Sequence, residues 1–589
     1  MLHHLRRPHF SLTVPGAPLH SSRSQAFLIN DDLKPFPPSL RTWGALNYLG
    51  FWIADGFNLS SMMIASTAVA AGLSWWQAWL AVWIGYGITA VVIAAQARTG
   101  AAYHIGFPVL ARSAWGVYGS VWPVLNRVVL AVVWFAFQSW VGGECTKLVL
   151  RSLSPSWGNA SAQLSGTTRN DFLSFFIFWL LQFPTTWVSP QKIKHLFTAK
   201  AVAMPIAALG LFGWTVGLAG GLGPVVHQKA TVSGSTLGWG FVVAVFSQLS
   251  NMVTLACNEP DFARLARKRS DVMLPQLLSI PLVFSITSLI GILVSSSSTV
   301  LFDGATTWNP LDILSGLLDR DPYNSSTRAG VFFIAAAFII AQMGTNVAAN
   351  SLSAGSDLTA LLPRYITIKR GQILCALISL CICPWYFASS SSSFTSYLSA
   401  YSVLLAPILG VIMCDSYALR RGKIDVPSLY QSHGAARYAR GFNWRAYAAY
   451  LIGCALNLPG FVAAVSPTLG ANVPMGLVRV YQMAFFTGSL SSALCYILFN
   501  QLSPVEGGVS VKEKGWYELK EEDTVDFDGT PFAFVQSYVQ GDVMEDVEQR
   551  SRSASADGDM GEKSEVDKGE GADSPKPQVT VTPFEATSK

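Results

Sequence analysis

Long apolar runs, separated by short polar segments, occupy the chain from Trp43 to Asn500. A helix needs about 20 mostly apolar residues to cross the hydrocarbon core of a bilayer. Twelve runs meet this requirement, and we number them as predicted spans 1–12: 44–70, 75–97, 122–148, 170–189, 197–221, 236–257, 274–297, 329–352, 372–388, 393–415, 446–467 and 478–500. Buried helices of a large water-soluble domain are the alternative, but apolar runs of this length with few charges are typical of membrane spans. The pattern therefore predicts an all-α membrane protein with twelve transmembrane helices.

Acidic residues are concentrated at the carboxyl-terminal end of the chain. Residues 1–502 contain 15 Asp and Glu against 31 Lys and Arg, whereas the 87 residues after them contain 20 against 9. Because a charge at the bilayer centre costs about 2.5–3.5 kcal/mol, this distribution agrees with membrane insertion. We expect three parts, which are a cytoplasmic segment at 1–42, the twelve-helix domain at 43–502 and a disordered acidic cytoplasmic tail at 503–589.

Basic residues in the loops predict the orientation. They collect in the amino-terminal segment and in the loops after spans 2, 4, 6, 8 and 10; the loop after span 4 carries Lys192, Lys194 and Lys200. By the positive-inside rule both termini are cytoplasmic. The opposite loops contain two glycosylation sequons, with Asn159 and Asn324 as the acceptor residues.

Lysines near the membrane suggest protein partners, whereas the cysteines suggest no metal site or disulfide framework. Three lysines close to the membrane are candidate ubiquitin acceptors, so a ubiquitin ligase and trafficking adaptors are the protein partners expected there: Lys512, Lys514 and Lys520. We expect no nucleic-acid partner. All eight cysteines lie in spans or at their ends, and no metal site or disulfide framework is predicted from them.

Polar side chains inside spans 1 and 3 are the first candidates for a binding site, since each must find a partner there. Asp55 and Asn58 lie three residues apart on one face of span 1, with Gly56 between them. Trp134 and Gln138 lie four apart in span 3. An indole plane beside an amide suits a flat, hydrogen-bonding heterocycle. Packing between helices is the alternative for both pairs.

Spans 6 and 8 are also polar. Span 6 contains Asn251 among serines, and span 8 places Gln342, Asn346 and Asn350 at four-residue steps on one face. Close helix packing is again the alternative. In transporters built from two inverted five-helix repeats, spans 1 and 6 correspond, as do spans 3 and 8. The four polar spans therefore favour a five-plus-five inverted repeat, spans 1–5 and 6–10, followed by two further helices.

At these residues the chain resembles the fungal uracil/allantoin-permease branch of the nucleobase-cation-symport-1 family. The most specific stretches are Trp52–Asn58, Gly72–Ala78, Trp134–Trp140, Asn258–Arg264, Gly344–Ser351 and Ser399–Ser402. The resemblance implies alternating access in the plasma membrane and uptake of a nucleobase-like heterocycle together with a cation.

The resemblance also implies a substrate site. Trp134 and Gln138 match the residues that hold the ring in the bacterial hydantoin-transporting relative, and Asn350 matches the one that bonds its polar edge. The span 1 amide falls on Asn58. The span 6 Gly-Trp pair falls on Asn251 and Met252, so the second aromatic face is missing and Phe57 is the expected substitute.

The cation-site positions implied by the resemblance lack one of the side-chain ligands that a sodium site would use. The positions fall on Ala54 and Phe57 of span 1 and on Ala341, Gly344 and Thr345 of span 8, where Gly344 lacks a hydroxyl ligand. Asp55 offers a protonatable group nearby, and we expect no basic residue at its depth. A proton, rather than sodium, is therefore the expected co-transported ion.

Gating is assigned to the cytoplasmic end of span 6 and to span 10. Asp261 and Arg264 lie three residues apart, within reach of a salt bridge, and Leu398 adjoins the Ser399–Ser402 stretch. A structural cap is the alternative for the charged pair.

The sequence as a whole predicts a proton-coupled importer, with no cofactor, of uracil first and allantoin next. A thiamine or nucleoside carrier of the same family, or a membrane sensor that does not transport, is the alternative. No catalytic cluster is found in the spans, so an enzyme is not expected.

Overall fold

The computed structural model describes residues 13–14, 27–36, 38–158, 162–187 and 190–505, and of residues 190–198 it describes the main chain only. Asn159, the three candidate ubiquitin acceptors and the acidic tail from residue 506 lie outside the described residues. So does most of the segment before residue 27.

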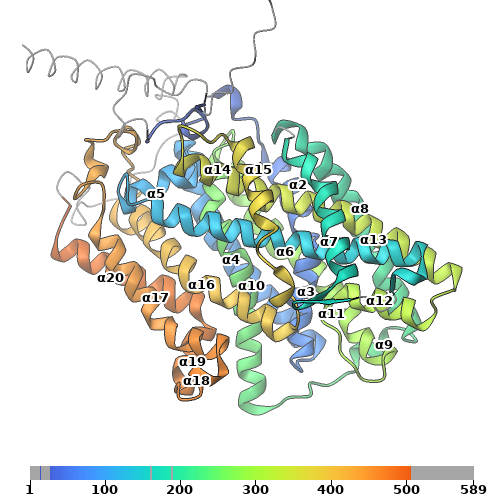
Figure 1. Cartoon of the computed structure of the whole chain (residues 1–589). Helices are drawn as coiled ribbons and strands as arrows, with labels where there is room; N and C mark the ends of the chain where they lie inside the picture. Colours follow the sequence, from blue (N-terminus) through green and yellow to red (C-terminus); the bar gives the residue numbers. More distant parts are fainter. Residues whose placement is uncertain (1–12, 15–26, 37, 159–161, 188–189, 506–589) are drawn as a thin grey trace, which may run out of the picture. The chain divides into compact units, whose positions relative to one another are not determined.

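Helices make up most of the described chain (Figure 1). In the first half these are α2 (Ala45–Gly56), α3 (Leu59–Ala70), α4 (Trp75–Tyr103), α5 (Phe107–Trp115), α6 (Val121–Leu153), α7 (Arg169–Gln182), α8 (Pro190–Leu218) and α9 (Leu222–Val226). The second half contains α10 (Gly234–Ala263), α11 (Arg269–Leu301), α12 (Pro310–Arg320), α13 (Ser325–Thr345), α14 (Leu352–Leu361), α15 (Ile368–Ser379), α16 (Ser391–Cys414), α17 (Trp444–Val465), α18 (Pro467–Gly470), α19 (Met475–Gln482) and α20 (Ala484–Leu502). Strands β1 (Gln163–Leu164) and β2 (Thr167–Thr168) form a short antiparallel pair with Gln163 opposite Thr168.

Within the described residues, eight helices are long and apolar enough to cross a membrane, or up to nine if α19 and α20, bent by 85°, count as one span. The all-α membrane prediction is confirmed, whereas the number twelve is not reached on this measure. Three predicted spans are too short as single helices. Span 1 is split into α2 and α3, of 12 residues each, and spans 4 and 9 correspond to α7 and α15, of 14 and 12 residues.

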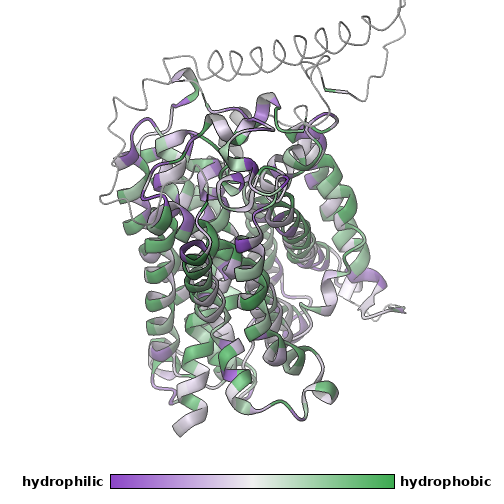
Figure 2. Ribbon diagram, turned by 90° about the vertical axis from the view of Figure 1, so that its left-hand side faces the viewer, coloured by the Kyte–Doolittle hydropathy of each residue, from purple (hydrophilic) through white to green (hydrophobic). Residues whose placement is uncertain are grey.

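Side-by-side packing joins helices that are distant in the sequence. Both α10 and α11 pack along α4, α13 and α14 pack along α6, and α17 and α20 pack on each other and on α16. Outward-facing apolar side chains remain exposed on these helices, for example Val91, Leu278 and Phe333, and Figure 2 shows the hydrophobic residues along them. Such exposure is what a lipid-facing surface requires.

Span 1 breaks at Phe57 and Asn58. The Asn58 side chain caps α3, because its Oδ1 accepts a hydrogen bond from the main-chain N–H of Ser61 at 2.7 Å, and its Nδ2 donates to the carbonyl of Asp55 at 2.5 Å. Asn is a favoured residue at such a helix start. A Cβ at Gly56 would lie 2.7 Å from Cγ1 of Val283, so glycine allows α2 to approach α11 closely. The break thus has a local cause in the sequence.

Span 8 is also irregular. The α13 helix passes into a π-helical turn at Asn346–Ser351 before α14 continues. Such turns are rare and are frequent at functional sites. Two of the three amide residues predicted to share a face, Asn346 and Asn350, lie in this turn.

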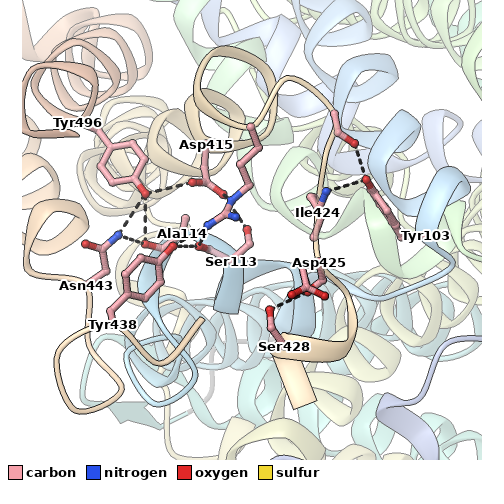
Figure 3. A network of polar contacts seen from close by, with 12 residues as sticks. Tyr103, Ser113, Ala114, Asp415, Ile424, Asp425, Ser428, Tyr438, Asn443 and Tyr496 are labelled. Carbon is pink, nitrogen blue, oxygen red and sulfur yellow. Dashed lines mark hydrogen bonds and ion pairs between the residues drawn. The ribbon is translucent and has the colours of Figure 1, made fainter. Parts of the chain in front are cut away.

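A buried polar cluster holds the end of α16 (Figure 3). The carboxylate of Asp415 accepts hydrogen bonds from Ser113 Oγ of α5 (2.9 Å), Arg420 Nε (2.7 Å) and Tyr496 Oη of α20 (3.1 Å). Asn443, which precedes α17, donates to the carbonyl of Ala114 at 2.6 Å. The cluster fastens α5, α16, α17 and α20 to one another at one point.

Candidate functional site

An aromatic group surrounds Trp134 on α6. Its indole ring is 5.4 Å from the ring of Phe137 and 5.7 and 6.2 Å from the rings of Tyr397 and Tyr401 on α16, measured between centroids. The hydroxyl of Tyr401 donates to the carbonyl of Ser250 on α10 at 2.8 Å. The site therefore includes α16, which the sequence analysis assigned to gating alone. The signal was present, because Tyr401 belongs to the Ser399–Ser402 stretch.

Gln138 lies one turn from Trp134 on α6 and is 4% exposed. Its Oε1 accepts two hydrogen bonds, from Gln342 Nε2 on α13 at 2.7 Å and from Ser60 Oγ on α3 at 3.2 Å. Spans 1, 3 and 8 therefore meet at one side-chain oxygen.

Asn350 is the last residue in a chain of hydrogen-bonded amide side chains. Its Nδ2 donates to Asn346 Oδ1 at 2.9 Å. The Nδ2 of Asn346 in turn lies 3.1 Å from the carbonyl of Phe135, 3.1 Å from Ser139 Oγ and 3.0 Å from Gln182 Oε1. Asn346 is fully buried, whereas Asn350 retains 7% exposure. The polar face predicted on span 8 is thus directed at α6 and its neighbours.

The other predicted substrate residues have different partners. Asn58 is engaged as the cap of α3, as described above. Asn251 donates from Nδ2 to the hydroxyl of Tyr86 at 3.1 Å, and Met252 is buried in the core. Phe57 stands half-buried at the break of span 1, and among the described rings it has no contact with that of Trp134.

A buried lysine lies at the predicted cation positions. Lys200 Nζ donates to Thr345 Oγ1 at 2.7 Å, and the threonine hydroxyl donates to the carbonyl of Ala341 at 3.0 Å. A Cβ at Gly344 would lie 3.0 Å from Cδ of Lys200, so the glycine that lacks the hydroxyl leaves room for the lysine. Lys200 is 2% exposed and interacts electrostatically with Asp55, which follows the buried Ala54 in α2 and is itself 7% exposed.

Two sequence-based expectations about this lysine are wrong. Lys200 was counted with the loop after span 4, although predicted span 5 already began at residue 197, and no basic residue was expected at the depth of Asp55. The physical reason is that α8 begins at Pro190, so Lys200 lies more than two turns inside the helix. A helix start marked by that proline was the signal that would have found it.

The charged residues at the end of α10 are arranged differently from the predicted pair. Asp261 Oδ1 accepts a hydrogen bond from the main-chain N–H of Phe107 at 2.9 Å. Arg264 contacts Asp261 only through the main-chain carbonyl, at 3.3 Å, and places its guanidinium 4.1 Å from the centroid of the Phe36 ring. Among the described residues, no side-chain ion pair at contact distance joins Asp261 to Arg264, although the two charges still interact electrostatically.

The buried ion pair at this end involves two residues that the sequence analysis did not single out. Arg127 of α6 and Asp357 of α14 are both fully buried and lie 2.6 Å apart, from Nη2 to Oδ2. Asp261 is a second carboxylate near this arginine, and its Oδ2 lies 3.9 Å from Arg127 Nη1. A lone arginine near the start of a predicted span was the available signal. Leu398, the third predicted gating residue, is fully buried in α16.

Asn324, the described sequon asparagine, is exposed at the start of α13. Its side chain accepts from the main-chain N–H groups of Ser326 and Thr327.

Comparisons with known proteins agree with this architecture. The sequence profile of a family described as permeases for cytosine/purines, uracil, thiamine and allantoin matches residues 35–488. The chain is 41% identical over 516 residues to the allantoin permease of Saccharomyces cerevisiae, which covers 85% of this chain and 80% of that protein. It is 40% identical over 515 residues to the uracil permease of the same yeast, which covers 84% and 79%.

One solved structure shows the same fold. Mhp1, a nucleobase-cation-symport-1 family transporter in a closed conformation with bromovinylhydantoin bound, superimposes with a TM-score of 0.65 at 22% identity and covers 86% of this chain and all of its own. The family profile spans most of the chain, and both yeast permeases exceed 30% identity over four fifths of it. The protein therefore belongs to the nucleobase-cation-symport-1 family of permeases and is a multi-pass transporter, not an enzyme.

Proposed function

We propose that this protein is a proton-coupled importer that carries uracil, or allantoin as the next candidate, across the plasma membrane. The single observation that supports this best is the meeting of spans 1, 3 and 8 at the side-chain oxygen of Gln138, one helical turn from the aromatic group around Trp134. The two yeast relatives named for allantoin and uracil favour the same substrates. Twelve spans, a five-plus-five repeat and cytoplasmic termini are part of the proposal.

Substrate binding follows from the chemistry of these side chains. The indole of Trp134 offers a flat apolar face to a heterocyclic ring, and stacking is worth about 0.5–1.5 kcal/mol beyond burial. Gln138 and Asn350 bond the polar edge of the ring. Asn251, Met252, Phe57 and the backbone around Asn58 are then the groups expected to close the site from spans 1 and 6.

Proton coupling is proposed for Asp55 and Lys200. With the Asp55 carboxylate ionised, the ammonium of Lys200 attracts it and also bonds Thr345, so spans 1, 5 and 8 are held together. A proton taken up by Asp55 removes that attraction and frees α2 to move relative to α8. Because the break of span 1 lies directly after Asp55, substrate and proton act on the same segment, which makes their binding interdependent. The ammonium also supplies a positive charge at Thr345, which favours proton over sodium coupling.

The inner gate is proposed for the cytoplasmic end of α10. Asp261 lies between the buried Arg127–Asp357 pair and the start of α5, so α6, α10 and α14 are drawn together there. Arg264 fastens the segment around Phe36 over the same place. Opening this end requires that these contacts separate. Leu398 is proposed as the barrier on α16.

Uptake of labelled compounds into cells that lack their own permeases tests the function. We expect uracil to accumulate against its gradient at external pH of about 5, without sodium, and to stop doing so when a protonophore is added. Accumulation of thiamine or a nucleoside alone would favour the alternative carrier, which the family description supports for thiamine. Binding without accumulation of any compound would instead indicate a sensor.

A further inference from the structure

The amide groups of the site are oriented by acceptors that cannot reverse their role. Gln342 Nε2 lies 2.7 Å from the side-chain oxygen of Gln138 and 3.3 Å from its main-chain carbonyl. A main-chain carbonyl only accepts, so Gln342 turns its NH₂ group to Gln138, and Gln138 turns its oxygen to Gln342. Ser60 adds a second donor to that oxygen. Within the described chain, the Nε2 of Gln138 is left without a partner.

The same argument sets the orientation of the Asn350 amide, but here the side-chain oxygen, not the NH₂ group, is left without a partner among the described residues. The carbonyl of Phe135, 3.1 Å away, holds the NH₂ group of Asn346, which leaves Asn346 Oδ1 to face Asn350. Asn350 therefore donates a hydrogen bond from its own Nδ2 to that oxygen at 2.9 Å. Its Oδ1 is left without a partner in the described part of the protein. One amide of the site thus offers a donor, and the other offers an acceptor.

We propose that Gln342 and Asn346 are positioning residues that set this hydrogen-bond polarity and thereby select the substrate class. The inference rests on the proposed uptake of a heterocycle and deepens it. The ring presents a carbonyl oxygen to Gln138 and an N–H to Asn350, as in a cyclic imide or ureide. A ring that carries an amino group in place of the carbonyl points a donor at a donor.

An amino-bearing ring presents its amino group to Gln138 only if Gln138 turns over. The turn breaks the bond from Gln342 and leaves a buried NH₂ group of Gln342 facing another NH₂ group. A lost hydrogen bond alone corresponds to a factor of about two to ten in affinity, and an unsatisfied buried donor increases it further. Specificity against the amino ring therefore comes from the NH₂ group of Gln342, which opposes the turned Gln138 without touching the substrate.

Uracil and cytosine are the matched probes, because cytosine carries an amino group where uracil has a carbonyl and a bare ring nitrogen where uracil has N–H. Their binding to the purified full-length protein is measured by calorimetry, which requires no transport. We expect the wild type to bind uracil at least about tenfold more tightly. Gln342→Met retains the length of the side chain but cannot donate, so Gln138 is free to turn. The uracil-to-cytosine ratio should then fall at least about fivefold, with uracil weakened and cytosine not.

Gln372→Met is the matched control, since Gln372 is also a fully buried glutamine, but it lies on α15 outside the site. It should leave the ratio unchanged. Gln342→Ala serves as a second variant if the methionine protein is unstable. An unchanged ratio in both Gln342 variants, or an equal weakening of both probes, would overturn the positioning role of Gln342 and leave the proposed function standing. A wild type that prefers cytosine would also overturn it, whereas a wild type that binds neither probe nor allantoin would overturn the proposed function and the substrate class together.

Discussion

Breaking the buried ion pair between Arg127 and Asp357 is expected to destabilise the protein strongly. Both side chains are fully buried, and the nitrogen and oxygen lie 2.6 Å apart. Removal of one partner from a buried pair costs about 3–5 kcal/mol, because the other charge stays buried without compensation. We therefore expect Arg127→Met and Asp357→Leu each to lower the free energy of unfolding by an amount in this range.

The two single variants should not be equal. Asp357→Leu leaves Arg127 with the carboxylate of Asp261 at 3.9 Å, an attraction of about 4 kcal/mol at an effective dielectric constant of 20. Arg127→Met leaves the Asp357 carboxylate without the cation it pairs with, while Asp261 retains the electrostatic attraction of Arg264. Arg127→Met should therefore fall at the upper end of the range and Asp357→Leu at the lower end. The double variant exchanges the pair for apolar side chains and should recover most of the loss.

Unfolding of the purified protein in mixed micelles, followed by titration with a denaturing detergent, measures these differences. Asp319→Asn is the control, since Asp319 pairs with Arg151 but is 67% exposed, and a surface pair contributes about 0–1 kcal/mol. Uptake assays on the stable double variant then separate gating from stability. If the single variants cost no more than the control, or if the double variant costs the sum of both, the buried-pair reasoning is refuted.

The remaining predictions concern the site and its supports. Trp134→Ala should raise the apparent KM for uracil about tenfold at normal surface expression, since stacking and burial are both lost; unchanged kinetics would exclude the ring as the platform. Lys200→Met should abolish accumulation against a gradient while binding persists, and Asp55→Asn should flatten the dependence of uptake on external pH between about 5 and 8; an unchanged pH profile in the latter would remove Asp55 from coupling. Asn58→Ala should lower the free energy of unfolding by about 0.5–2 kcal/mol through loss of the α3 cap, as measured by detergent titration. Burial, with a contribution from nearby Arg41, lowers the pKa of His104, which follows α4, from 6.5 to about 4; the unfolded chain then takes up the proton first, so stability should fall as pH drops from about 6.5 towards 4, and His104→Gln should lessen that fall.

The sequence was most informative where polar residues interrupt apolar runs. Asp55, Gly56 and Asn58 mark the point where span 1 breaks, and a helix cap explains why an asparagine stands there. The spacing of Gln342, Asn346 and Asn350 indicated a shared polar face, and all three side chains make hydrogen bonds within the amide network of the site. In a bilayer, such groups have few other partners, so their periodicity is strongly constrained.

Long-range pairing was not accessible in the same way. Lys200 meets Thr345 across 145 residues, and Arg127 meets Asp357 across 230. Nothing in the local pattern around either residue specifies its partner, since the partner is set by how the helices pack. The same holds for Arg264, which lies over Phe36 rather than beside the side chain of its near neighbour Asp261. Twelve spans are not confirmed on the length criterion, because α7 and α15 are shorter than the predicted runs that contain them and span 1 is split into two helices.

The polar cluster around Asp415 has a consequence for biosynthesis. Its hydrogen bond to Tyr496 joins residues 81 positions apart, and Tyr496 lies in the last described helix. At about 5–20 residues per second of translation, Asp415 waits roughly 4–16 s for that partner. Until then its buried carboxylate relies on Ser113 and Arg420 alone. A chain that stops before α20 therefore leaves an incompletely satisfied acid at the end of α16.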